Sequence, residues 1–144
     1  MAVIVGVIGL GPMGGNIARK LLEKEFNVVG YDLISEKILA LEDTGIEVAQ
    51  DCIELAENSD VIITSLPNIN ALEAVINDIT KSTKMGQIVI ECSTLEVRQK
   101  IEVADKLQKA GKVMLDAPIS ATPSMLAEGM ASIHIGGDKM AYDE

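Results

Sequence analysis

The hydrophobic positions of this chain form short apolar runs that alternate with amphipathic stretches. Residues 3–8 make an unbroken, β-branched run, which is typical of a parallel strand covered on both faces. Further strands are predicted at 27–31, 61–66, 88–92, 113–115 and 131–135, and helices at 13–24, 36–42, 71–79 and up to about residue 110. This alternation predicts an α/β fold, with a doubly wound, mainly parallel sheet and helices on both faces.

Polar residues and one glycine predict where several helices begin and end. We expect Ser35 to cap the helix over 36–42, and Asp51 to open a short helix. Ser93 and Glu96 have the S-x-x-E spacing of a capping box, which predicts the start of the last long helix. Gly111 is expected to end that helix, because glycine adopts the left-handed conformation that closes a helix.

The stretch "VIGLGPMGG" places Gly9, Gly11 and Gly14 in G-x-G-x-x-G spacing between a predicted buried strand and a predicted helix. The spacing alone is weak evidence, but this context is that of a dinucleotide-binding loop. Gly9 would permit the tight turn, Gly11 the close approach of a pyrophosphate, and Gly14 the packing of helix on strand. Pro12 suits the first helical position, and with Leu10 and Met13 it completes the predicted loop. We therefore expect an anion to bind at this helix end.

An acid about twenty residues after the glycines is the second half of this fingerprint. Asp32 fits, because it follows the second predicted strand. Its carboxylate would accept hydrogen bonds from the adenosine ribose and repel a 2′-phosphate, and Leu33 supplies no cation. We therefore predict a Rossmann-type domain over residues 1–144 that prefers NAD to NADP. The competing interpretation is a tight turn followed by a surface aspartate.

The motifs "TSLPN", "ECSTLE" and "LDAPIS" resemble those of the β-hydroxyacid dehydrogenase family, the 3-hydroxyisobutyrate dehydrogenase group, over nearly the whole chain. The resemblance implies that Leu66, Pro67 and either Asn68 or Asn70 contact the cofactor. It also implies that Thr94 lies at the nicotinamide end. The implied activity is hydride transfer between NAD and a small hydroxy acid.

The family's substrate motif, D-x-P-V-S-G-G, aligns with the residues from Asp116 to Thr122. The resemblance implies that Ser120 holds the substrate carboxylate. The chain departs from the motif at Ala121 and Thr122, which stand where the family has two glycines, so the resemblance does not identify the substrate. Asp116 could orient the substrate or fix a turn, and both readings stay open.

The family's general acid/base is a lysine on a helix beyond the nucleotide domain, and no counterpart is found up to Glu144. Lys139, in "GGDKM", is expected to be a surface residue. We expect "HIGGDKMAYDE" to end the domain without a closing helix. The resemblance thus implies a fragment that lacks the family's helical second domain, is inactive alone, and forms a homo-oligomer through that domain in the intact protein.

The composition of the chain argues against two classes of binding partner. A formal charge of −10 and 2% aromatic residues argue against binding nucleic acid or an anionic membrane. The apolar start of the chain lacks the features of a signal peptide. Cys52 and Cys92 have no metal-ligand spacing, so no metal site is predicted, and the cytoplasm is the expected location.

Two other functions stay open, a non-enzymatic NAD-binding module and a domain related to imine reductases. Because imine reductases tend to use NADP and to replace the substrate serine, Asp32 and Ser120 argue against the second. His134 and Cys92 are interpreted as structural residues. Met125, Leu126 and Met130 are expected to mark an apolar interface.

Overall fold

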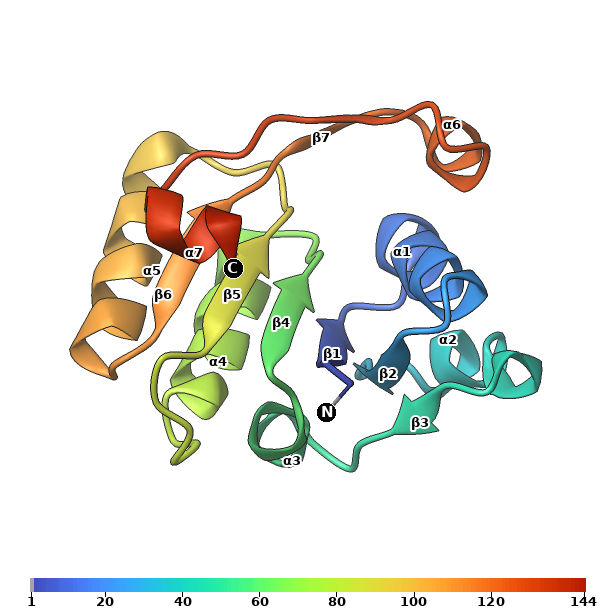
Figure 1. Cartoon of the computed structure of the whole chain (residues 1–144), viewed down its shortest axis with the longest axis horizontal. Helices are drawn as coiled ribbons and strands as arrows, with labels where there is room; N and C mark the ends of the chain where they lie inside the picture. The colour runs from blue at the N-terminus through green and yellow to red at the C-terminus, as the bar shows by residue number, and fades with distance from the viewer. Residues whose placement is uncertain (1) are drawn as a thin grey trace.

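The computed structural model describes residues 2–144, so Met1, the first residue of the expected domain, lies outside the described residues. Six strands form one parallel sheet in the order β3-β2-β1-β4-β5-β6 (Figure 1). The strands are β1 (Ile4–Ile8), β2 (Asn27–Tyr31), β3 (Glu47–Val48), β4 (Val61–Thr64), β5 (Ile88–Glu91) and β6 (Val113–Asp116). The chain leaves β1 toward one side and resumes at β4 on the other, so the ends of β1 and β4 form the topological switch point. The predicted doubly wound sheet is confirmed, although the two-residue edge strand β3 was not predicted.

Helices cover both faces of this sheet, as predicted. They are α1 (Pro12–Glu23), α2 (Ser35–Leu39), the 3-10 helix η1 (Glu42–Thr44), α3 (Cys52–Asn58), α4 (Ile69–Ile79), α5 (Val97–Lys109), α6 (Pro123–Ala127) and α7 (Lys139–Asp143). Buried aliphatic residues of α3, α4 and α5, such as Leu55, Leu72 and Leu107, form one core cluster with the sheet. Ala18 of α1 and Leu41 belong to a second cluster with Val5 and Val7. The core is thus built almost entirely of aliphatic side chains, which is the expected consequence of the low aromatic content.

Two of the predicted helix caps were wrong. Helix α5 begins three residues later than expected, because its capping box is formed by Glu96 and Gln99. The Oε1 atom of Gln99 accepts the Glu96 N–H at 3.3 Å. Ser93 instead accepts the N–H of Leu66 through Oγ at 2.8 Å, a contact between distant residues that local spacing does not reveal. Ser35 is the first residue of α2 and not its cap. The predicted start at Asp51 is confirmed, since its Oδ1 accepts the Glu54 N–H at 2.8 Å.

Two long helices end in the same kind of turn. After α5, Gly111 has φ +73° and donates its N–H to Gln108 O at 3.0 Å, while Lys112 N–H donates to Leu107 O at 2.9 Å. This is a Schellman motif, and it confirms the role predicted for Gly111. After α1 the equivalent position is Glu25, which has φ +64°. A residue with a Cβ is strained in this left-handed conformation.

Replacing Glu25 by glycine should therefore stabilise the fold by up to about 1 kcal/mol, because the turn stays the same and the strain is relieved. The measurement is the urea midpoint of unfolding. Glu23→Gly, two residues earlier inside α1, is the matched control and should destabilise by roughly 0.5–1 kcal/mol. A lower urea midpoint for Glu25→Gly would contradict this account of the turn.

Residues 117–138, here called the crossing segment, leave the sheet after β6. They contain β7 (Ile119–Ser120), α6 and β8 (Ser132–Ile133). Figure 1 shows the segment passing over the carboxyl ends of the strands to α6, which lies beside α1. Asn16 of α1 ties the two helices together, because its Nδ2 donates to Pro12 O at 2.7 Å and to Pro123 O at 3.2 Å. The crossing segment thus roofs the edge at which the glycine loop lies.

The C-terminal part of the chain differs from the prediction in two ways. The strand predicted at 131–135 is reduced to β8, which pairs antiparallel with β7 and not with the main sheet. His134 lies outside it and is exposed. The chain does not end without a helix, as was expected, because the short helix α7 forms there; its start is capped by Asp138, which accepts the Ala141 N–H at 3.0 Å. Lys139, exposed as expected, forms an ion pair with Asp143.

The amino edge of the sheet holds a buried lysine. Lys112 is 1% exposed, and its Nζ donates to Lys84 O at 2.6 Å and to Gln87 Oε1 at 3.2 Å. Burial lowers the pKa of Lys112. This amine belongs to the packing between β5 and β6 and lies at the edge opposite the glycine loop.

Among residues 2–144, none of the helices combines the length and the apolar composition needed to cross a bilayer. Over the same residues, no three His, Cys, Asp or Glu side chains gather in a group that could hold a metal ion.

Candidate functional site

The glycine loop packs backbone against backbone at the topological switch point. Gly9 has φ +89°, and a Cβ there would overlap the carbonyl group of Ser65 at the end of β4. A Cβ on Gly14 would overlap the carbonyl oxygen of Gly9. Gly11 is different, because a Cβ there would meet nothing closer than Lys37 Nζ, at 3.7 Å. Gly9 and Gly14 are therefore required by the fold itself, whereas a side chain at Gly11 would occupy space that a ligand can use.

The start of α1 faces this space with its N–H groups. Gly11 is the N-cap and Pro12 is at the first helical position. Within the described part of the chain, no side chain caps this end. Its N–H groups and the positive end of the helix dipole therefore suit an anionic group such as a diphosphate.

Asp32 holds the other side of the loop. Its Oδ2 accepts the N–H of Leu10 at 2.7 Å and its Oδ1 accepts the N–H of Ile34 at 2.9 Å. The side chain is 9% exposed, and Lys37 Nζ lies 4.0 Å from Oδ2. Because each carboxylate oxygen can accept a further hydrogen bond, Asp32 can fix the loop and still bind ribose hydroxyls.

These groups surround a pocket of about 450 Å³ at the carboxyl ends of β1, β2 and β4. The structure brings many of the predicted cofactor residues together in its lining, namely Gly9, Gly11, Pro12, Met13, Gly14, Asp32, Leu33, Leu66 and Pro67. A glycine loop, an uncapped helix start and an acid thus converge on one cavity, an arrangement that suits a dinucleotide.

The other predicted site residues do not line this pocket. Leu10 is buried behind the loop. Asn68 caps α4, because its Oδ1 accepts the Ala71 N–H at 2.9 Å, and Asn70 is exposed in the first turn of that helix. Thr94 is exposed between β5 and α5, and Ser120 is exposed in β7. Their predicted contacts to cofactor or substrate remain predictions.

Several lining residues were missed by the sequence reasoning. Helix α4 contributes one face, made of Ala71, Ala74, Val75 and Asp78. Their i, i+3, i+4, i+7 spacing is a signal that could have shown this face, but not that it borders a cavity. Lys37 was also missed, because nothing in the sequence shows that its side chain turns back toward Asp32.

Both cysteine thiols are suppressed as nucleophiles. Cys52 lines the pocket but is 4% exposed, and burial, assisted by Asp78 and Asp51, raises its pKa to about 12. Burial and the neighbouring Glu91 raise the pKa of Cys92 to about 12 as well. At neutral pH neither thiol is ionised, which agrees with a structural role for Cys92.

This raised pKa predicts slow reaction with thiol reagents. At pH 8 a thiol with a pKa of about 12 is ionised to roughly one part in ten thousand, against about a quarter for an ordinary thiol. Folded protein should therefore label at least about a hundredfold more slowly than urea-unfolded protein, and the folded rate should rise about tenfold per pH unit. Dithiobisnitrobenzoate absorbance measures both rates. Rapid labelling of either cysteine at pH 8 in folded protein would contradict the assigned burial.

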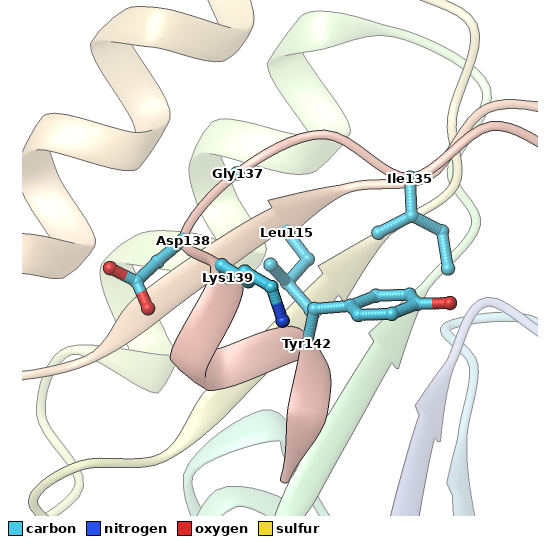
Figure 2. Close-up of a pocket in the computed structure, with 6 residues that line it drawn as sticks. All are labelled: Leu115, Ile135, Gly137, Asp138, Lys139 and Tyr142. Carbon is cyan, nitrogen blue, oxygen red and sulfur yellow. The ribbon is translucent and has the colours of Figure 1, made fainter.

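A smaller pocket of about 210 Å³ lies against β6 and α7. Figure 2 shows Ile135 and Leu115 near the ring of Tyr142, whereas the carboxylate of Asp138 points away from it. Its lining carries none of the predicted site residues. The candidate site is therefore the larger pocket at the glycine loop.

The strand order, the glycine loop and the acid after β2 define a Rossmann-type dinucleotide-binding domain. The family described as the NAD binding domain of 6-phosphogluconate dehydrogenase matches residues 4–144, and the chain belongs to this family. NAD is accordingly its cofactor.

Among similar proteins, human mitochondrial 3-hydroxyisobutyrate dehydrogenase is 35% identical over 136 residues, which cover 92% of this chain and 40% of the relative. The structure of Mycobacterium tuberculosis 3-hydroxyisobutyrate dehydrogenase with L-serine has a TM-score of 0.95 at 25% identity, covering 99% of this chain and 49% of that one. An imine reductase from Pseudomonas sp. has a TM-score of 0.91 at 24% identity, covering 99% and 50%, and shares the fold. The chain thus spans about 40% of the length of this human relative.

Proposed function

We propose that this chain is the NAD-binding part of an oxidoreductase that transfers a hydride between NAD and a small hydroxy acid, of the 3-hydroxyisobutyrate dehydrogenase kind. The observation that carries the cofactor part is the position of Asp32, which is bonded to the Leu10 N–H and faces the pocket below the start of α1. The substrate class is supported by the relatives named above.

In this proposal the diphosphate lies at the start of α1 and the adenosine ribose at Asp32. Bound NAD would supply the hydride acceptor, and the protein would supply orientation and a surrounding electric field. Asp32 favours NAD because its charge opposes a 2′-phosphate. The ammonium of Lys37 lies close enough to offset part of that charge. A preference for NAD therefore requires that the repulsion of a 2′-phosphate by Asp32 exceeds its attraction by Lys37.

The substrate would lie between the pocket and the crossing segment. Ser120 is proposed to hold its carboxylate, and its exposed place in β7 leaves the hydroxyl free to do so. Thr122 is occupied differently, because its Oγ1 accepts the Met125 N–H at 3.2 Å and caps α6. Ala121 and Thr122 are the two positions that differ from the family motif, and Thr122 is thus used to cap a helix.

The proton of the hydroxyl group needs a separate donor or acceptor. Lys100 is held between two carboxylates, and Lys139 is exposed in α7, so neither is suited to this task. We propose that a lysine outside residues 1–144 moves the proton, that these residues form one NAD-binding domain, and that they are inactive alone. We also propose that the intact protein is a homo-oligomer, assembled outside this domain.

Asp32→Asn tests the cofactor site. The amide can accept one of the two backbone N–H groups but places a donor against the other, and it loses the charge that holds the ribose. Loss of one or two charge-assisted hydrogen bonds of about 1.5–3 kcal/mol each should weaken NAD binding at least about tenfold. The ratio of NADP to NAD affinity should rise, because the charge that opposes the 2′-phosphate is gone. Isothermal titration calorimetry measures both affinities.

Asp43→Asn, which removes an exposed charge from η1, is the matched control and should leave both affinities unchanged. The cofactor assignment would be wrong if Asp32→Asn bound NAD as tightly as the original chain, with an unchanged NADP to NAD ratio and an unchanged melting temperature.

A stand-alone NAD-binding module is the second candidate, because the described residues hold a pocket that suits a dinucleotide but no identified proton donor. The two candidates differ in activity and not in NAD affinity. In an NADH-production screen over short 2- and 3-hydroxy acids, this chain should be inactive and the longer product of its gene active. If no longer product exists, or if it is inactive, the module is favoured. Activity of residues 1–144 alone would contradict the proposed location of the acid/base.

A further inference from the structure

A chain of polar contacts crosses the carboxyl ends of β4 and β5 behind the pocket wall. Leu66, which lines the pocket, donates its N–H to Ser93 Oγ at 2.8 Å. Ser93 in turn donates its own N–H to Glu91 Oε1 at 2.9 Å, and Thr64 Oγ1 donates to the same oxygen at 3.4 Å. Glu91 is fully buried at the end of β5. The position of the Leu66 backbone therefore depends on a buried carboxylate two contacts away.

Lys100 of α5 compensates the charge of this carboxylate. Its Nζ lies 3.0 Å from Glu91 Oε2, and the side chain is 7% exposed. This ammonium is the charged partner of Oε2, the carboxylate oxygen that Ser93 and Thr64 do not contact. Burial by itself would lower the pKa of Lys100, but the neighbouring carboxylates of Asp116 and Glu91 outweigh it and raise the pKa. The ammonium thus stays charged.

The same ammonium reaches the crossing segment. Lys100 Nζ donates to Asp116 Oδ1 at 2.5 Å. The backbone of Asp116 is paired with Gly136, with N–H to O distances of 2.9 and 2.8 Å in the two directions. Asp116 therefore holds both ends of the crossing segment, one through its own chain and one through Gly136. One buried amine thus connects the pocket wall at Leu66 with the segment that roofs the site.

A buried ion pair need not be there for stability, because an apolar pair of similar volume is often as stable. What makes this cluster notable is that both of its ends reach elements of the site. We propose that Lys100 is a positioning residue of the dinucleotide site. Its ammonium compensates the buried charge of Glu91, Glu91 holds Ser93, and Ser93 holds the Leu66–Pro67 wall. This inference rests on the proposed function, namely that the pocket binds NAD.

The proposal predicts a rescue that a purely structural lysine would not produce. Lys100→Met leaves the buried carboxylate of Glu91 without a counter-charge, because its other partners, the Thr64 hydroxyl and the Ser93 N–H, are neutral donors. A buried carboxylate without a counter-charge must draw in water, which loosens Ser93 and the pocket wall. Neutralising Glu91 as well should therefore restore the wall.

The experiment is an NADH fluorescence titration of the whole chain at pH 7. Lys100→Met should bind NADH about tenfold more weakly than the original chain. The double variant Glu91→Gln/Lys100→Met should recover to within about threefold, because no buried charge is left unpaired; Asp116, whose side chain is 43% exposed, stays hydrated. Lys106→Met, an exposed position on the same helix, should change nothing.

Ser93→Ala tests the last link without disturbing the ion pair and keeps the test decisive if Lys100→Met does not fold. It should weaken NADH binding severalfold. Unchanged affinity in Ser93→Ala or in a folded Lys100→Met, or no recovery in the double variant, would overturn the inference while leaving the proposed function intact. Failure of the original chain to bind NADH would instead refute the proposed function, and the inference with it.

Discussion

The site depends on a contact between backbones at the switch point, where Gly9 meets Ser65 and Gly14 meets Gly9 with no room for a Cβ. This contact sets the angle at which α1 leaves β1, so the N–H groups at its start point into the space above β4. A larger residue at either position would push the helix outward and separate the uncapped helix start from Asp32. The position of the uncapped helix start opposite Asp32 is therefore set by steric contacts between glycines. The ligand would bind in a space that this packing already leaves open.

Three acids stand at the ends of strands along the same edge, and each is used first for architecture. Asp32 after β2 accepts two backbone N–H groups, Glu91 at the end of β5 accepts Ser93, and Asp116 at the end of β6 accepts Lys100. In a chain with a formal charge of −10, these carboxylates would repel an anionic cofactor if they were left bare. The backbone donors that hold them, and the ammonium groups of Lys37 and Lys100 that lie beside them, reduce that cost. The edge can thus be rich in acids and still accept a diphosphate.

Sequence reasoning was most successful where local chemistry decides the structure. The apolar runs predicted the buried strands, and the glycine spacing with Asp32 predicted one wall of the pocket, because both depend on residues that act close to their own position. Asp51 and Gly111 acted as predicted for the same reason, since the donors or acceptors they meet lie within a helical turn.

The failures share the opposite cause. Ser93 has the spacing of a cap but bonds to Leu66, twenty-seven residues away. The sequence gives no sign that Lys37 lines the pocket, because only the folded turn after Asp32 brings its amine there. The strand predicted at 131–135 became the short β8, because its partner is β7 in the crossing segment and not the main sheet. Such choices are made by tertiary contacts, which no local pattern encodes.

The buried amine of Lys112 has a consequence for chemical modification. Its nitrogen is enclosed by the carbonyl of Lys84 and the side chain of Gln87, so an acyl group could not be accommodated there without displacing both. Acetyl donors and amine-directed cross-linkers would reach the exposed lysines of the native domain but not this one. Acetylation of Lys112 would therefore show that the protein was unfolded, or locally unfolded around this residue, when it reacted.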